Sequence, residues 1–182
     1  MIMVAFYHAF TYNNNEVINM IRKATQNDLA IIVEMNLCLA QETEQLILPK
    51  TTVICGVQAV LDDPRKGVYW VATIDDVVVG QLLITYEWSD WRCANWWWIQ
   101  SVYTLPQYRH QGIYTKLYRF IQNEMMKQDD VCGLRLGVDH NNYLAQKTYQ
   151  KLGMHESNYF MYEQTKKNVF AYSNTHLPHN NE

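Results

Sequence analysis

The hydrophobic residues of the chain recur with two different spacings, and the spacing changes repeatedly after residue 20. Apolar residues three or four positions apart form the buried side of an α-helix. This spacing predicts helices over residues 29–37, 49–61, 111–127 and 141–152. The third helix is the clearest, because apolar side chains recur at every fourth position at Ile113, Leu117 and Ile121.

Shorter runs rich in β-branched and aromatic residues separate these helices, and such runs favour strands. They predict strands over residues 20–25, 68–74, 77–88 and 131–139, a strand that ends at Thr104, and a last strand over residues 159–164. Asp75-Asp76 lies between two of these runs and is a hairpin signal. Gly80 marks either a bulge or a close approach of the backbone. This alternation predicts an α/β fold with a mixed sheet.

Several helix ends carry the residues that commonly stop or start a helix. Thr25, with Asp28 three positions later, resembles a capping box ahead of the first helix. Pro49 suits the first turn of the second helix. Gly153 is a candidate C-terminal cap for the last helix. These signals agree with the hydrophobic spacing.

The composition fits one domain with an ordinary core. A chain of 182 residues, 48% of them hydrophobic, can bury a large core without disulfides or metals. The net charge is −3 and the 15 Lys and Arg residues are scattered, which argues against a nucleic-acid partner. The cysteines, at positions 38, 55, 93 and 132, lack metal-site spacing. We expect no metal, and reduced thiols in a cytoplasmic compartment.

The chain divides into three predicted parts. Residues 1–19 look like an extension without a basic segment, and His8 interrupts their apolar run, so neither a signal peptide nor a membrane partner is expected. Met20 is a hypothetical natural start of the chain. Residues 20–165 form the expected domain, and residues 166–182 form a polar tail.

Residues 99–114, with the sequence IQSVYTLPQYRHQGIY, join the strand that ends at Thr104 to the 111–127 helix. Pro106 stops the strand and Gly112 opens the helix. The first N–H groups of a helix have no partner within the helix, and the helix dipole adds positive charge there. This strand, loop and helix start is therefore a candidate site for phosphate oxygens.

Two sequence motifs occur in and after this stretch. The first is R-H-Q-G at positions 109–112, and the second is N-Y-L-A at positions 142–145, followed by Tyr149, Lys151 and Gly153-Met154. They resemble the R/Q-x-x-G-x-G/A loop and the N-x-x-A-x-x-x-Y-x-K-x-G-F block of the GNAT family of N-acetyltransferases, in the same order. The two motifs together are far more specific than either alone.

The resemblance implies a mixed, splayed central sheet of about six or seven strands flanked by helices, with acetyl-CoA as co-substrate. The family loop binds the pyrophosphate, and here it would comprise Arg109, His110, Gln111, Gly112, Ile113 and Tyr114. Tyr114 stands where the loop usually has its second Gly or Ala. The pantetheine would pair with the main chain of Val102, Tyr103 and Thr104, whose backbone groups would polarise the thioester carbonyl.

Tyr149 is the candidate catalytic acid. In the family a tyrosine at this place lies over the cofactor sulfur, where its hydroxyl can protonate a leaving thiolate with a pKa of about 8.5. The alternative is a core tyrosine on the apolar side of the 141–152 helix. Asn142 also has two readings, one as a contact to the cofactor and the other as a helix N-cap.

An N-acetyltransferase also needs a proton acceptor, because an alkyl ammonium with a pKa of about 10.4 holds little free amine at pH 7. Some relatives that acetylate polyamines carry a Glu in the central strand. Gln100 stands at that place here, and an amide is not a base. Glu87, at the end of the preceding strand, is the candidate base. The alternative is a water chain ordered by Gln100.

Three consecutive tryptophans stand in the strand that ends at Thr104. Trp96 and Trp98 must share one face of the strand and Trp97 the other. They either bury aromatic area in the core or form an aromatic wall of the acceptor pocket, where an amine would gain cation–π stabilisation.

The sequence thus predicts an acetyl-CoA-dependent N-acetyltransferase that acts by direct attack in a ternary complex. The acceptor would be a primary amine of a small molecule or a protein, and a homodimer is a further hypothesis. A non-catalytic acyl-CoA sensor or interaction module of the same fold is the alternative, because the central-strand Glu is missing.

Overall fold

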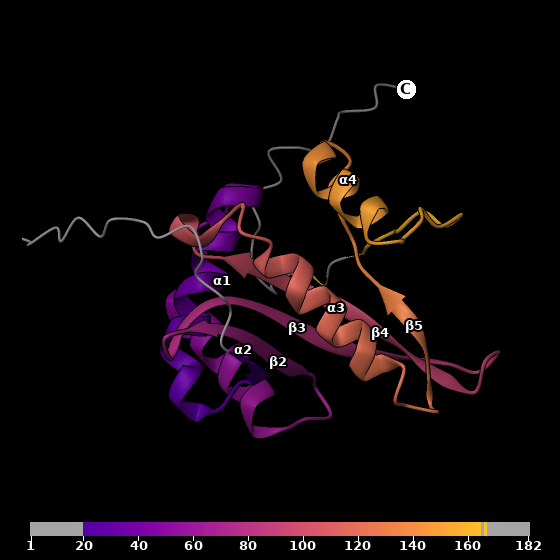
Figure 1. Ribbon diagram of the computed structural model, residues 1–182, viewed down its shortest axis with the longest axis horizontal. Helices are drawn as coiled ribbons and strands as arrows, with labels where there is room; N and C mark the ends of the chain where they lie inside the picture. The colour runs from indigo at the N-terminus through magenta and orange to yellow at the C-terminus, as the bar shows by residue number, and fades with distance from the viewer. Residues whose placement is uncertain (1–19, 165, 167–182) are drawn as a thin grey trace, which may run out of the picture.

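The computed structural model describes residues 20–164 and 166. The predicted 1–19 extension and the predicted tail, apart from residue 166, lie outside the described residues. One sheet contains β1 (Met20–Lys23), β2 (Val68–Ile74), β3 (Val77–Ser89), β4 (Ala94–Thr104) and β5 (Val131–Arg135), in that order. The first three pairings are antiparallel and the β4–β5 pairing is parallel. The mixed α/β fold is therefore confirmed (Figure 1).

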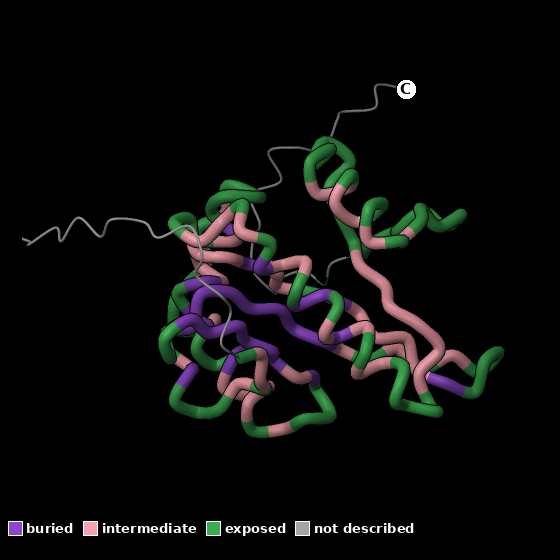
Figure 2. Tube along the Cα trace, viewed as in Figure 1, coloured by how far each residue is buried: buried purple, intermediate pink, exposed green. Residues whose placement is uncertain are grey.

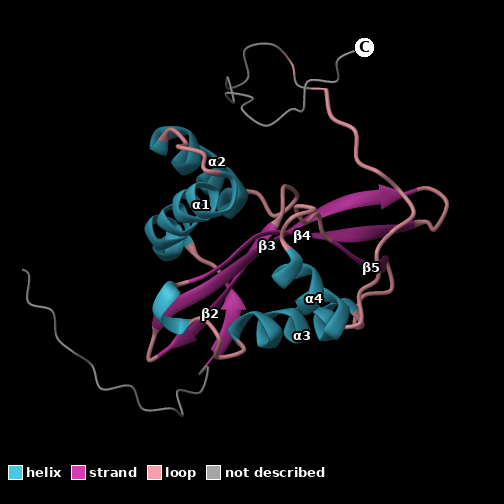
Figure 3. Cartoon of the chain, turned by 90° about the horizontal axis from the view of Figure 1, so that it is seen from above, coloured by secondary structure: helices cyan, strands magenta, loops and turns pink. Residues whose placement is uncertain are grey.

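Helices cover both faces of the sheet (Figure 3). They are α1 (Leu29–Glu44), α2 (Lys50–Asp62), α3 (Ile113–Met125) and α4 (Tyr143–Lys151). Ile32 of α1 and Val57 of α2 belong to the core on one face with Leu83, whereas Leu117 of α3 belongs to the core on the other face with Leu82. Neighbouring strand residues point to opposite faces, so β3 serves both cores. No helix in the described residues combines the length and hydrophobicity that crossing a membrane requires.

The burial pattern follows this layering. The central strands β2 and β3 are buried along most of their length, while β5 and α4 are half-buried or exposed (Figure 2). Transfer of apolar side chains from water drives this packing. The centre of the sheet is therefore its most buried part, and the more exposed segments, β5 and α4, lie toward its edge.

The hairpin and the Gly80 predictions are confirmed. Asp75 and Asp76 have φ values of 47° and 62°, as a two-residue type I′ turn requires. The pairing of β2 with β3 shifts where Ala72 faces Gly80. A Cβ on Gly80 would lie 2.9 Å from Cγ2 of Ile113. Gly80 thus lets the start of α3 approach the sheet closely.

A bulge interrupts β4, and the hydrophobic pattern did not predict it. The register with β3 shifts between Gln100 and Tyr103, where β4 has one residue more than its partner. Ser101, inside the bulge, has a φ of 48°, in the left-handed region that non-glycine residues seldom adopt. Strained backbone of this kind occurs preferentially at functional sites.

The strand predicted over residues 131–139 is shorter than expected, because β5 ends at Arg135. It pairs with β4 only from Asn95 to Trp98. Beyond Trp98, no strand in the described part of the chain pairs with this edge of β4. The sheet is splayed at this point, and the backbone groups of the free edge are open to another partner.

The last predicted strand is wrong. Residues 159–164 have no regular structure, and Tyr159, Phe160 and Tyr162 are 78%, 81% and 93% exposed. A run with strand propensity forms a strand only where a neighbouring strand and a core receive it. The sheet therefore has five strands in the described residues rather than about six or seven.

Asp28, 5% exposed, ties β1 to the start of α1. Its carboxylate accepts hydrogen bonds from the Arg22 guanidinium at 2.7 and 2.9 Å and from the Thr25 N–H at 2.7 Å. The capping-box prediction is thereby confirmed. The Arg22 guanidinium and, to a lesser extent, Thr25 hold the pKa of Asp28 below its usual value. This contact therefore stabilises the fold above about pH 4, and its contribution is lost as the pH falls further.

Asp28→Asn should lower the free energy of unfolding at pH 7 by about 1–3 kcal/mol, because Arg22 loses a charged acceptor. Urea unfolding of wild type and variant at pH 7 and at pH 3 measures this loss. The difference should shrink at pH 3, where the wild-type carboxylate loses its advantage. A difference of equal size at both pH values would contradict the ionic origin of the stabilisation.

Candidate active site

A cleft of about 430 Å³ opens between α1, the end of β4 and the start of α3. The predicted co-substrate residues that line it are Val102, Tyr103, Thr104, Arg109, His110, Gly112, Ile113 and Tyr114. Leu39, Glu42 and Thr43 of α1 complete its wall, together with Thr148 of α4. Gln111 and Asn142 are not among the lining residues. The fold therefore brings the strand end and the predicted loop together in one cleft.

The start of α3 is shaped to present backbone N–H groups. Gly112 has a φ of 74° and immediately precedes Ile113, the first residue of the helix. A Cβ on Gly112 would meet no atom within 4 Å, so glycine suits this position because of its conformation and not for lack of space. The first N–H groups of α3 have no partner within the helix and lie at the wall of the cleft. This is the geometry of an anion site.

The side chain of Arg109 holds the loop against the neighbouring elements. Its Nε donates to the Thr104 carbonyl oxygen at 3.0 Å, and its guanidinium donates to Glu42 at 2.6 Å. The guanidinium also lies 5.1 Å from the ring centroid of Tyr103. Because Glu42 and the Thr104 carbonyl already bind the Arg109 side chain, the groups of this loop that can bind an anion are mainly its backbone N–H groups.

Glu42 belongs to the cleft, and sequence reasoning gave it no role. The Tyr103 hydroxyl donates to Glu42 at 2.6 Å. This hydrogen bond and the Arg109 guanidinium hold the pKa of Glu42 below its usual value, while burial and the Glu42 carboxylate raise the pKa of Tyr103. Glu42 stays ionised and Tyr103 stays protonated near neutral pH. No motif or spacing marks Glu42, because it lies in the exposed last turns of α1.

Tyr149 packs against Tyr114 and is not one of the cleft-lining residues, although its neighbour Thr148 is. The two rings meet edge to face with centroids 5.8 Å apart. Burial raises the pKa of Tyr149, which keeps its hydroxyl protonated at neutral pH, as a proton donor must be. The Tyr114 hydroxyl is buried without a hydrogen-bond partner in the described residues. The role of Tyr149 as acid stays a prediction.

Asn142 caps α4. Its side-chain oxygen accepts a hydrogen bond from the Ala145 N–H at 3.1 Å, which satisfies one of the unpaired donors of the first turn. Of the two readings from the sequence, the N-cap is therefore confirmed. Gly153, with a φ of 90°, ends the same helix as predicted.

Glu87 lies away from the cleft, on the part of the sheet where β3 and β4 extend toward their hairpin. Its carboxylate accepts hydrogen bonds from Arg135 at 2.6 Å and from the Trp98 indole at 2.5 Å. In register it faces Trp96, whose ring lies 4.1 Å from the Arg135 guanidinium. Both carboxylate oxygens are thus engaged by protein groups, and the structure does not bring Glu87 to the predicted acetyl-transfer site.

The three consecutive tryptophans of β4 point to alternate faces of the sheet, as the alternation along the strand predicted. Trp97 packs against the core beneath α3, whereas Trp96 and Trp98 flank Arg135. No tryptophan lines the cleft or the smaller pocket between α1, α2 and β4. Gln100 is exposed and donates to the Thr85 hydroxyl at 2.6 Å, so it faces solvent on the strand that leads to the bulge.

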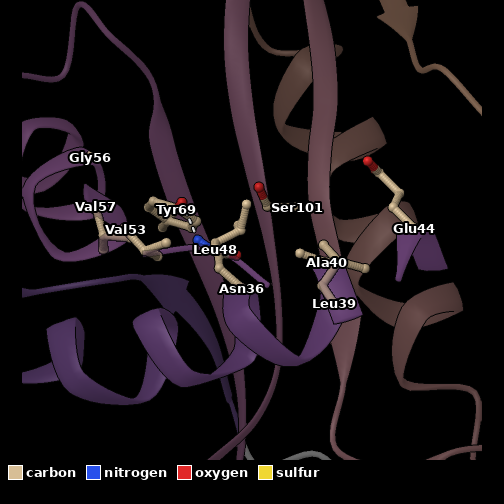
Figure 4. Close-up of a pocket in the computed structure, with 10 residues that line it drawn as sticks. All are labelled: Asn36, Leu39, Ala40, Glu44, Leu48, Val53, Gly56, Val57, Tyr69 and Ser101. Carbon is tan, nitrogen blue, oxygen red and sulfur yellow. Dashed lines mark hydrogen bonds between the residues drawn. The ribbon is translucent and has the colours of Figure 1, made fainter. Parts of the chain in front are cut away.

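A second pocket, of about 270 Å³, lies between α1, α2 and the bulge of β4 (Figure 4). Asn36, Tyr69 and Ser101 supply its polar groups, and Asn36 donates to the Tyr69 hydroxyl at 2.9 Å. Behind them, the buried Gln81 amide donates to Asn36 at 2.7 Å. Leu39 lines both this pocket and the cleft. The two hollows therefore share Leu39 of α1 as part of their walls.

The described residues contain no cluster of three or more His, Cys, Asp or Glu residues arranged to hold a metal ion. The polar groups of the cleft are backbone N–H groups, hydroxyls, the side chains of Arg109 and His110, and the Glu42 carboxylate, which accepts from Arg109 and Tyr103. This donor set suits a phosphorylated or carbonyl-bearing ligand.

Comparison with solved structures identifies proteins that are similar to this chain. A possible acetyltransferase from Clostridium difficile 630 is 45% identical to this chain, with a TM-score of 0.78. The match covers 81% of this chain and 97% of that one. A predicted acetyltransferase with acetyl-CoA from Clostridium acetobutylicum is 17% identical, with a TM-score of 0.64 and coverages of 80% and 95%. The aminoglycoside N-acetyltransferase AAC(6')-Iy in complex with CoA is 16% identical, with a TM-score of 0.65 and coverages of 81% and 94%. At such low identity, the last two show likeness of fold alone.

Curated proteins gave no match. The family model described as "Acetyltransferase (GNAT) family" matches residues 39–154, which is more than half of the chain. The matched segment contains the cleft, the splayed strand pair and the loop at the start of α3. The chain belongs to the acetyltransferase (GNAT) family.

Proposed function

We propose that this chain is an acetyl-CoA-dependent N-acetyltransferase that acts on a primary amine of a small molecule or a protein. One observation carries the proposal. The unpaired edge of β4 beyond Trp98 leads through the bulge at Ser101 to the N-terminus of α3, and the end of that edge and the helix start line one cleft. Two proteins of the same fold hold acetyl-CoA and CoA. Release of CoA that depends on both acetyl-CoA and an amine tests the proposal.

The pyrophosphate and the pantetheine of acetyl-CoA would contact different parts of the cleft. The pyrophosphate would bind the N–H groups that follow Gly112, where the helix dipole adds positive charge. The amide groups of the pantetheine would pair, as an added strand does, with the backbone edge at Val102 to Thr104. No strand in the described residues pairs there, although the Thr104 carbonyl accepts a hydrogen bond from Arg109. Such a pairing would place the thioester next to the bulge, and Ser101 of the bulge also lines the second pocket.

The reaction needs an amine, a polarised carbonyl and a proton donor. The neutral amine attacks the thioester carbon, a C–N bond forms, and the C–S bond breaks as the thiolate leaves. Backbone N–H groups at the strand end stabilise the negative charge on the carbonyl oxygen. Tyr149 donates its proton to the thiolate, and the proton released by the ammonium passes to a base or to water.

Water is the acceptor that the geometry favours for the amine proton. Glu87 is engaged by Arg135 and Trp98, and Glu42, which lines the cleft, is engaged by Arg109 and Tyr103. Gln100 is exposed close to the bulge. Its side-chain nitrogen donates to the Thr85 hydroxyl, and its side-chain oxygen would order solvent. We therefore retain the water chain, with Glu87 as the competing hypothesis.

Glu87→Gln should leave the pH dependence of kcat/KM unchanged, because the rate then follows the ionisation of the amine itself. Gln100→Ala should lower kcat/KM on the rising limb by disturbing the ordered water. A pH–rate series on wild type and both variants measures this. If only Glu87→Gln loses the rising limb of the plot of kcat/KM against pH, Glu87 is the base. If kcat/KM of Gln100→Ala is unchanged, the hypothesis of a water chain ordered by Gln100 is rejected.

A non-catalytic acyl-CoA sensor is the second candidate. It is favoured by one specific observation: the carboxylate that lines the cleft, Glu42, is held by Arg109 and Tyr103. A sensor binds acetyl-CoA without releasing CoA when amines are present, so the same CoA-release assay separates the two functions.

A further inference from the structure

The pocket beside the β4 bulge has a polar end and an apolar wall. Asn36, Tyr69 and Ser101 form the polar end. The apolar wall consists of Leu39, Ala40, Leu48, Val53 and Val57. Figure 4 shows the hydrogen bond that joins Asn36 to Tyr69, while Glu44 stands apart at the end of α1. A ligand that fits this lining has one polar end and an apolar body.

The polar end is held in place by a hydrogen-bonded chain. Gln81, fully buried, donates to Asn36, and Asn36 donates in turn to the Tyr69 hydroxyl. The Gln81 side-chain oxygen has no partner in the described residues. Such a chain fixes the direction of the Asn36 and Tyr69 groups, because each buried polar atom depends on its neighbour.

The charge of the lining limits the ligand further. Glu44 is the one charged residue among the lining residues, and it is exposed. A polycation would need several carboxylates to replace the water lost from its ammonium groups. A ligand with one ammonium group loses much less hydration, because only that end is charged. The lining therefore favours a monoamine over a polyamine or an aminoglycoside.

The size of the pocket agrees with a compact body. At roughly 30 Å³ for each water molecule, a volume of about 270 Å³ equals about nine waters. An arylalkylamine such as 2-phenylethylamine has a similar number of heavy atoms. Spermidine matches it in size and differs from it in charge, so the two molecules form a useful pair of probes.

We propose that this pocket is the acceptor site and that it selects a single primary amine on a compact apolar body, with the amine directed to Asn36, Tyr69 and Ser101. The proposal rests on the proposed acetyltransferase function. It adds the chemical class of the acceptor and the residues that select it.

Gly56 of α2 offers a way to fill the pocket without disturbing the fold. It lines the pocket, has helical backbone, and a Cβ there would meet no atom within 4 Å. It lies three positions from Val53 and four from Val60, so its side chain would project from the same side of α2. Leucine also favours the helix more than glycine does. Gly56→Leu should therefore fold and occupy pocket volume. Thr52→Leu, at an exposed position of the same helix that does not line the pocket, is the matched control.

The experiment measures CoA release from acetyl-CoA with 2-phenylethylamine, spermidine and an aminoglycoside, and acetyl-CoA affinity by calorimetry. The wild type should prefer 2-phenylethylamine in kcat/KM by at least about 10-fold. Gly56→Leu should lower that kcat/KM by at least about 10-fold with unchanged acetyl-CoA affinity, while Thr52→Leu should stay within about 3-fold of wild type.

Two kinds of result would overturn the proposal, and they are distinguishable. Equal or better use of spermidine or the aminoglycoside, or wild-type kcat/KM in Gly56→Leu, would reject the acceptor class and leave the acetyltransferase function standing. Absence of acetyl-CoA binding, or binding without CoA release with any amine, would reject the acetyltransferase function and the acceptor site with it.

Discussion

Gly112→Pro should weaken acetyl-CoA binding by at least about 10-fold, which corresponds to about 1.4 kcal/mol or more. Proline fixes φ near −65°, whereas Gly112 has a φ of 74° at the start of α3. The substitution must therefore redirect the loop and the first N–H groups of the helix. Calorimetric titration with acetyl-CoA measures the effect, after circular dichroism has shown that the variant is folded.

Gly112→Asn is the matched control, because asparagine tolerates left-handed backbone better than other non-glycine residues. A side chain at position 112 enters open space, so steric exclusion does not separate the two variants. Gly112→Asn should keep most of the affinity. Unchanged acetyl-CoA affinity in a folded Gly112→Pro protein would show that the pyrophosphate binds elsewhere.

Tyr149→Phe should lower kcat by about 10- to 1,000-fold and leave acetyl-CoA affinity nearly unchanged. Phenylalanine keeps the edge-to-face contact with Tyr114 and removes only the hydroxyl that would protonate the thiolate. Single-turnover kinetics with saturating amine measure the chemical step, and calorimetry measures the affinity.

Tyr118→Phe provides the comparison for this variant. Tyr118 is buried, its pKa is also raised by burial, and its ring packs near Tyr114, but it stands outside the N-x-x-A-x-x-x-Y block that gives Tyr149 its predicted role. Removal of the Tyr118 hydroxyl in Tyr118→Phe should leave kcat within about 3-fold of wild type. Equal single-turnover rates for wild type and Tyr149→Phe would return Tyr149 to a packing role.

The sequence predicted those elements of the fold whose signals are local. The four-residue spacing of Ile113, Leu117 and Ile121 marked α3, and the Asp75-Asp76 turn marked the hairpin. The end of β5 at Arg135 and the missing strand over residues 159–164 could not be read in this way. Whether a strand continues depends on the neighbour that pairs with it, and hydrophobic alternation carries no information about that neighbour.

The same distinction separates the predicted and unpredicted parts of the cleft. The loop at Gly112 follows from a short motif and a helix start, and it does line the cleft. Glu42 contacts Tyr103 and Arg109, which are 61 and 67 positions away along the chain. The bulge at Ser101 arises from the pairing of β4 with β3. Contacts over such separations become visible only after the chain has folded.

Transfer of an acetyl group to an amine in this cleft is the central step of the proposed function. Acetyl-CoA labelled in its acetyl group, incubated with the full chain and an excess of 2-phenylethylamine, tests this directly when CoA release and labelled acetamide are both quantified. We expect one labelled acetamide for each CoA released, and lower rates of both acetamide formation and CoA release in Tyr149→Phe. Tight acetyl-CoA binding without labelled product, for this amine and for every other amine offered, would contradict it and favour a sensor.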